Sequence, residues 1–303
     1  MENEFLSNTI STLIINGFNI GKVTRFPNKN NLIYAHKFDK LGAKISYGIL
    51  FSPDTTETPI VRTLISQSRT ENFNPILVSD HLNVEDCQTY TNPQFFDFFG
   101  GIINTGLILV PNLSSILNDL GSNKLPPGLS GEPDDLHELY ITECLQFLTD
   151  SPTRRYGIER SFQSLPDGVI IGKQKFMILL DSKSYSKGFS FKADDIKRFA
   201  SYVDDFNNRY SSYFGNIFSF LVVSGDFTDS IESLQGRSNE LYKLCNCKLS
   251  CIRSEDLGGI TQRLISLPDF KKSIVWKNIF SETFINEKTI TEEITRIKKD
   301  RLH

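Results

Sequence analysis

Three residues between positions 165 and 185 have the types and the spacing that phosphodiester hydrolysis needs. The stretch LPDGVIIGKQKFMILLDSKSY contains two short apolar runs, GVII and FMILL, and an aspartate stands at one edge of each, Asp167 and Asp181. Lys183 follows two residues after the second aspartate. Side chains alternate along a strand, so Asp181 and Lys183 point to the same face and Ser182 points away.

A buried carboxylate needs compensation, and two close carboxylates repel each other unless a cation lies between them. If the two runs pair as antiparallel strands, Asp167 comes near Asp181. The predicted ligands of a Mg²⁺ ion are then these two carboxylates and the backbone carbonyl of Ser182, because Mg²⁺ takes hard oxygen ligands together with water and phosphate. The metal would polarise a phosphoryl oxygen and lower the pKa of a bound water. Lys183 would stabilise negative charge or orient that water.

The same residues also allow a simpler interpretation. Asp181 and Lys183 can form an ion pair on an edge strand, which contributes less than about 1 kcal/mol. Pro-Asp-Gly at 166–168 is a strong turn signal by itself. The spacing alone therefore leaves a nuclease and a structural interpretation open.

The elements that would position these residues alternate between strands and helices, which indicates an α/β fold. In the second half we expect a helix over 134–149, strands over 168–171 and 176–185, and a helix over 192–208. In the first half, 12–25 and 32–52 read as strand-rich, with a hairpin in the latter.

The stretch GSNKLPPGLSGEPD, residues 121–134, is rich in glycine and proline and is the best candidate for a linker. It predicts a small α/β domain over 1–125 and a second domain over 130–303.

The composition of the chain limits the functions that it can have. The 303 residues carry a formal net charge of −3, and acidic and basic residues nearly balance in both halves, so any nucleic-acid surface must be a local patch. No apolar run is long enough for a membrane helix, and the acidic N-terminus lacks the features of a signal peptide, so we expect a cytoplasmic location. Histidine is absent between His137 and His303, which argues against histidine-dependent chemistry in that half.

The five cysteines are an odd number. Cys245, Cys247 and Cys251 cluster, but their spacing is not Cys-x-x-Cys. We expect small apolar residues on half-buried strands rather than a zinc site.

The second half resembles the PD-(D/E)xK nuclease superfamily, and within it the cleavage domain of type IIS restriction endonucleases of the FokI kind. The resemblance covers roughly residues 135–265 and rests on several ordered blocks. These blocks are PDG at 166–168, DSKSYSKGF at 181–189, ADDIKRF at 193–199, FLVVSGDF at 220–227 and NCKLSCIRSEDL at 246–257.

The resemblance implies a restriction-endonuclease-like mixed sheet flanked by helices. It makes Asp167 and Asp181 metal ligands and Lys183 the catalytic lysine of a Mg²⁺-dependent, site-specific deoxyribonuclease of type II, IIS-like, in a restriction or phage-defence system. Glu143 on the preceding helix would be a further acidic group, although a solvated helix face explains it better.

The resemblance also bears on assembly. Asp194 and Arg198 are four residues apart and share a helix face, where they can form one intrahelical ion pair. In the resembled family a matching pair lies between two cleavage domains, which implies a homodimer or heterodimer that cuts both strands of double-stranded DNA.

The first domain departs from the family, because only about 130 residues precede the matching blocks and no helix-turn-helix is evident. It could be a specificity domain, a partner module or a degenerate nuclease-like fold. The alternative function for the whole chain is a non-catalytic DNA-binding or assembly subunit of a restriction system.

Overall fold

The computed structural model describes most of the chain and divides it into two compact units. The described residues are 2–15, 18–26, 29–38, 44–53, 59–71, 73–84, 87–92, 94–95, 107–151, 153–156, 165–172 and 176–300. The N-terminal unit is Met1–Ile102 and the C-terminal unit is Ile103–His303. Both are mixed α/β structures, each with its own sheet, as the sequence predicts.

The C-terminal unit is a mixed sheet between helices. Its described strands have the order β11-β10-β9-β8-β7-β6; β6, β7 and β8 are antiparallel, and β8 to β11 are parallel. The elements are α4 (Leu113–Gly121), α5 (Pro133–Thr149), β6 (Thr153–Arg155), β7 (Gly168–Gly172), β8 (Phe176–Lys183), α6 (Ala193–Phe214), β9 (Ile217–Ser224), α7 (Ile231–Cys245), β10 (Lys248–Arg253), α8 (Ser254–Ile265), α9 (Pro268–Ser273), α10 (Trp276–Ile279), β11 (Phe284–Ile285) and α11 (Glu287–Asp300).

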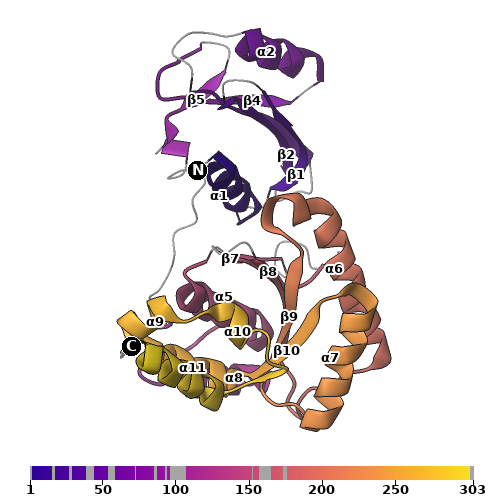
Figure 1. The fold of residues 1–303 in the computed structure, drawn as a ribbon, viewed down its shortest axis with the longest axis vertical. Helices are drawn as coiled ribbons and strands as arrows, with labels where there is room; N and C mark the ends of the chain where they lie inside the picture. The colour runs from indigo at the N-terminus through magenta and orange to yellow at the C-terminus, as the bar shows by residue number, and fades with distance from the viewer. Residues whose placement is uncertain are drawn as a thin grey trace. The chain divides into compact units, whose positions relative to one another are not determined.

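Helices cover both faces of this sheet, and for this reason β8 is apolar on both sides. Ile178 and Leu180 belong to one core cluster with Ile141 and Leu145 of α5. The other face packs on α6, where Phe199 stacks on Phe220 of β9 at 4.1 Å between ring centroids. Figure 1 shows α6 and α7 on one side of the strands, with α5, α8 and α11 on the other.

The alternation along β8 fixes the direction in which Asp181 points. Leu179 pairs with Phe220 in the parallel β8–β9 ladder, so both side chains face α6. Asp181 lies two residues after Leu179 and therefore faces α6 as well.

The N-terminal unit is built around a second mixed sheet, with described strands in the order β1-β2-β3-β4-β5. β1, β2 and β3 are antiparallel, and β4 and β5 continue in parallel with β3. Leu32, Leu50 and Leu77 cluster with Val61 and Leu64 of α2 on one face. Figure 1 shows α1 on the opposite side of the strands. The elements are α1 (Glu2–Ile15), β1 (Asn19–Arg25), β2 (Asn31–Phe38), β3 (Lys44–Phe51), α2 (Pro59–Glu71), β4 (Asn74–Val78) and β5 (Gln88–Tyr90).

The division into units falls between Ile102 and Ile103, earlier than the boundary that the sequence places between 125 and 130. Helix α4 packs in the C-terminal unit because its end approaches β9 closely. A Cβ added to Gly121 would come within 2.7 Å of the Cα of Gly225, which follows β9. The glycine- and proline-rich stretch thus connects α4 and α5 within one unit.

None of the helices in the described part of the chain combines the length and the apolar composition that crossing a membrane requires.

Candidate active site

The register of β7 and β8 sets the two aspartates opposite each other. Gly168 pairs with Leu180 in this antiparallel ladder. Asp167 precedes Gly168 and Asp181 follows Leu180, so the two aspartates occupy the next pair of opposed positions. The antiparallel pairing on which the sequence prediction depends is therefore present.

Asp167 is held by the backbone and side chain of the strand opposite. The N–H of Ser182 donates a 2.6 Å hydrogen bond to Oδ2 of Asp167, and the Ser182 hydroxyl donates a second one of 3.1 Å. On its other side, the Asp167 carbonyl accepts from the N–H of Tyr156 at 2.7 Å.

The glycine of the PDG motif has a packing reason. A Cβ at Gly168 would lie 2.8 Å from the carbonyl oxygen of Arg154 on β6, so a side chain would push the strands apart. Gly168 thus lets β6 and β7 pair closely beside Asp167.

Asp181 and Lys183 form a buried pair. The Lys183 ammonium lies against Oδ2 of Asp181, and Asp181 is only 4% exposed. Burial raises the pKa of the Asp181 carboxyl to about 6; the charge of Asp167 pushes in the same direction and Lys183 opposes it. Burial lowers the pKa of Lys183, but the charges of Asp181 and Asp167 outweigh it, so that its pKa lies above the usual value. An exposed surface ion pair would not show these shifts.

The residues present fit a hard divalent cation. Asp167 and Asp181 lie close enough for the charge of Asp167 to raise the pKa of Asp181. A cation between the two carboxylates would relieve this repulsion. The Ser182 N–H points towards Asp167, and in a strand the carbonyl of the same residue points to the same side. Asp167, Asp181 and the Ser182 carbonyl are therefore the residues that would hold the ion.

Two glutamates of α5 carry shifted pKa values, and only one of them was predicted from the sequence. Glu143 is half-buried rather than solvated, and burial raises the pKa of its carboxyl. Glu138 is 6% exposed and accepts a 3.0 Å hydrogen bond from Nε of Arg155. Burial raises the pKa of Glu138 to about 7, Arg155 opposes this, and the charge of Asp167 adds to it. Glu138 is thus the α5 carboxylate coupled to the site, and its partner Arg155 is the only signal that could have identified it.

Helix α4 anchors the segment that follows β8. The Ser184 hydroxyl donates to the carbonyl of Leu120 at 2.6 Å, and the Tyr185 N–H donates to that of Gly121 at 3.0 Å. The sequence does not reveal this contact, because Leu120 and Ser184 are 64 residues apart and α4 carries no polar motif.

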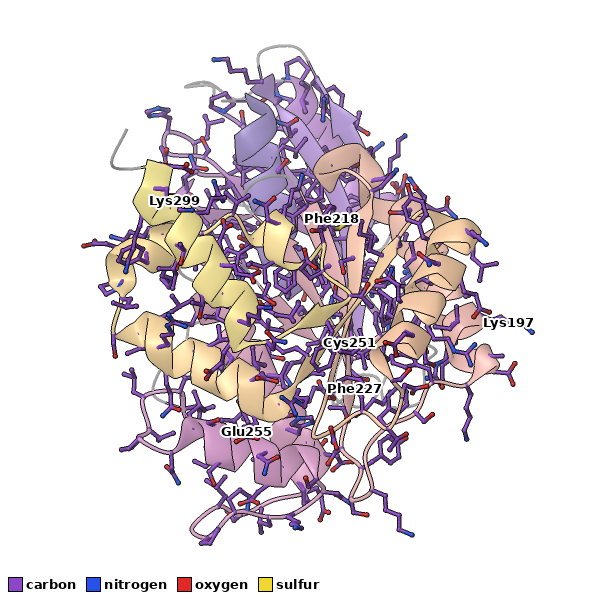
Figure 2. All side chains as sticks on the ribbon, turned by 60° about the horizontal axis from the view of Figure 1, so that its bottom comes forward. Lys197, Phe218, Phe227, Cys251, Glu255 and Lys299 are labelled. Atoms are coloured by element: carbon purple, nitrogen blue, oxygen red, sulfur yellow. The ribbon has the colours of Figure 1, made fainter. Side chains whose placement is uncertain are left out.

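The residues predicted for the dimer interface lie in the first turns of α6. The side chain of Asp194 is 95% exposed. Arg198 pairs with Asp195 at 2.9 Å and not with Asp194, so the expected intrahelical pair is absent. Lys197, between them on the helix, projects away from the protein (Figure 2). The charge of Arg198 also lowers the pKa of Asp181, which places this turn near the site.

The mixed sheet between helices, with opposed aspartates and a lysine at the ends of β7 and β8, agrees with the restriction-endonuclease-like fold that the sequence predicts. The family model for the FokI cleavage domain matches residues 128–291, which is more than half of the chain. The chain belongs to the FokI cleavage-domain family.

Solved structures give a more distant likeness. The structure of the restriction endonuclease FokI is 18% identical, with a TM-score of 0.45, and the match covers 59% of this chain and 32% of that one. FokI bound to DNA is 15% identical, with a TM-score of 0.41 and a coverage of 68% and 37%. The match thus spans about a third of the length of those chains. No curated protein matches this chain significantly.

Proposed function

We propose that the chain is a Mg²⁺-dependent, site-specific DNA endonuclease of the type II, IIS-like kind, which serves restriction or phage defence. The carrying observation is the opposed pair of Asp167 and Asp181 with the Lys183 ammonium against the second carboxylate. Membership of a family named for a nuclease cleavage domain supports DNA as the substrate.

Each residue has a distinct part in this proposal. Asp167 and Asp181 would hold Mg²⁺, together with the Ser182 carbonyl. When bound, the ion supplies Lewis-acid polarisation of a phosphoryl oxygen and a lowered pKa for water. The hydrogen bonds from Ser182 fix the direction of the Asp167 carboxylate. Lys183 stays protonated, because its pKa lies above the usual value, and it stabilises the charge that develops on the phosphate.

Two chains would act together on duplex DNA. One site cuts one strand, so a double-strand break needs two sites or two successive events. The exposed Asp194 and the partly exposed Arg198 are available to a second nuclease unit, and in a two-fold contact each would meet the other residue of the partner.

The test is cleavage of supercoiled plasmid and of unmethylated phage DNA by the purified chain, with Mg²⁺ and with EDTA. Lys183→Ala is compared with Lys288→Ala, which makes the same change at a side chain that is 83% exposed. We expect fragments that need Mg²⁺, persist in Lys288→Ala and disappear in Lys183→Ala.

Other outcomes separate the alternatives. Nicking without linear product would indicate that a second subunit is required. DNA binding without any cleavage, unchanged in Lys183→Ala, would favour a non-catalytic DNA-binding or assembly subunit and contradict the proposal.

A further inference from the structure

The two units share an order of elements. In each unit a helix is followed by three antiparallel strands, by a second helix and by a parallel strand that lies next to the third strand; in the C-terminal unit α4 precedes this series. In the C-terminal unit this series is α5, β6, β7, β8, α6, β9, and in the N-terminal unit it is α1, β1, β2, β3, α2, β4. In each unit a further parallel strand follows, β10 or β5.

The register shows which residues of the N-terminal unit occupy the positions of the aspartates. Asn31, the first residue of β2, pairs with Phe51, the last residue of β3. The next opposed positions are those of Asn30 and Ser52, as Asp167 and Asp181 are the next positions beyond β7 and β8. Asn30 and Ser52 are 1% and 3% exposed, so polar side chains are buried here too.

Ser52 and Asp181 also lie on equivalent faces of their sheets. Ser52 lies two residues after Leu50, which packs on α2, the helix that joins β3 to β4. Asp181 likewise faces α6, the helix that joins β8 to β9. Asn30 and Ser52 thus stand where the C-terminal unit has Asp167 and Asp181, so neither of those two carboxylates is present in this second series.

One basic residue stands at the same place in both units. Arg155 ends β6 opposite the first residue of β7, and Arg25 ends β1 opposite the first residue of β2. Arg155 is paired with Glu138, whereas Arg25 is exposed on the edge strand of its sheet.

The part of the sequence that contains Arg25 is strongly basic. Residues 5–53 contain six lysines and arginines and a single acidic residue, whereas residues 54–102 contain two and seven. Arg25 is exposed, and so are Lys22 on β1, Lys29 after β1 and Lys44 at the start of β3. The near-neutral total of the chain conceals this basic segment.

We propose that the N-terminal unit is a second, non-cleaving copy of the nuclease core, and that its basic β1–β3 segment binds the phosphate backbone of DNA. Asn30 and Ser52 replace the metal-ligating carboxylates, so the copy holds DNA without hydrolysing it. That the bound phosphates belong to DNA rests on the proposed function. Contacts to phosphates carry no sequence information, so this copy contributes to the affinity for DNA and not to sequence specificity.

Charge reversal tests the binding surface. The affinity of the full chain for a mixed-sequence DNA duplex is measured in EDTA over a series of salt concentrations. Lys22→Glu/Arg25→Glu/Lys29→Glu should weaken binding at least about tenfold and reduce the salt slope by about 2 to 3, because each phosphate contact contributes about one unit. Lys288→Glu, a control on α11, should change neither.

The outcomes separate this inference from the proposed function. Unchanged affinity and slope in the triple variant would overturn the binding surface, even if the chain cuts DNA with Mg²⁺. Weakened binding together with an absence of cleavage would uphold the surface while the proposed function fails.

A second experiment tests the equivalence of positions. Asn30→Asp/Ser52→Asp is introduced into an Asp181→Asn background, which removes a ligand of the proposed metal site. If the positions correspond, two opposed carboxylates now face each other, and Mg²⁺ or Mn²⁺ should raise the melting temperature. The control Asn31→Asp/Ser52→Asp puts the same charges on opposite faces of the sheet. A cation response equal to that of the control would overturn the equivalence.

Discussion

The N–H of Ser182 donates a 2.6 Å hydrogen bond to Oδ2 of Asp167. This bond joins the residue before β7 to the strand that carries Asp181 and Lys183. It holds the Asp167 carboxylate in place although that residue lies outside the paired part of the sheet. The Ser182 hydroxyl adds a bond of 3.1 Å to the same oxygen.

Ser182→Ala should reduce the cleavage rate and the apparent Mg²⁺ affinity by about tenfold, because groups that orient metal ligands typically contribute 10- to 100-fold. We expect the lower end of this range because the backbone N–H of residue 182 still donates to Asp167. Cleavage rates over a Mg²⁺ titration measure it, with Ser233→Ala, at an exposed serine of α7, as the control. A rate and an affinity equal to the wild type would show that Asp167 needs no support from this side chain.

Arg155→Ala should lower the free energy of unfolding by about 3 kcal/mol at pH 8, because it leaves the Glu138 carboxylate buried without its partner. Arg155→Ala/Glu138→Gln should recover most of that loss, since the unpaired charge is gone. Urea unfolding of the two variants measures both values. If the double variant is no more stable than the single one, the loss is due to packing and not to the charge.

His137 should make the fold sensitive to mild acid. It is fully buried, its Nε2 lies 2.7 Å from Oγ of Ser254, and burial lowers its pKa to about 3. A histidine in an unfolded chain titrates near 6.5. Its folded-state pKa is lower, so it costs no stability above pH 6.5 and costs progressively more as the pH falls towards 3.

At pH 5 this cost is about 2 kcal/mol relative to pH 7. The free energy of unfolding should therefore fall between pH 7 and pH 5 by about that much more in the wild type than in His137→Gln. Denaturant unfolding at the two pH values gives the comparison. An equal fall in both proteins would show that another group carries the acid sensitivity.

Asp194→Ala should weaken double-strand cutting several-fold more than nicking. The Asp194 side chain is 95% exposed, so its removal leaves the fold of the unit and the site intact. Linear and nicked products from supercoiled plasmid are quantified over time, with Lys288→Ala as the control. Equal loss of both products would argue against a role of this residue between two nuclease units.

The sequence predicts the C-terminal unit well because its signals are local. The two apolar runs, the alternation of Asp181 and Lys183, and the helices on either side are readable in short windows. The antiparallel pairing that brings Asp167 to Asp181 follows from the proximity of the two runs. The role of Asp181 and its partners in catalysis stays a prediction.

Other features depend on packing between distant segments. Residues 12–15 belong to α1 although the stretch reads as strand-rich, because short apolar runs fit either structure. The affiliation of α4 depends on contacts such as Gly121 with Gly225, and the coupling of Glu138 to Asp167 passes through β6. No local pattern contains these relationships.

The most direct test of the catalytic assignment is the single-turnover cleavage rate of Asp181→Ala at saturating Mg²⁺, measured with its affinity for the same DNA in EDTA. Asp205→Ala, at a partly exposed aspartate of α6, is the control. We expect a loss of at least about a thousandfold in rate with unchanged affinity and an intact fold. Cleavage by Asp181→Ala at the wild-type rate would contradict the assignment of the site.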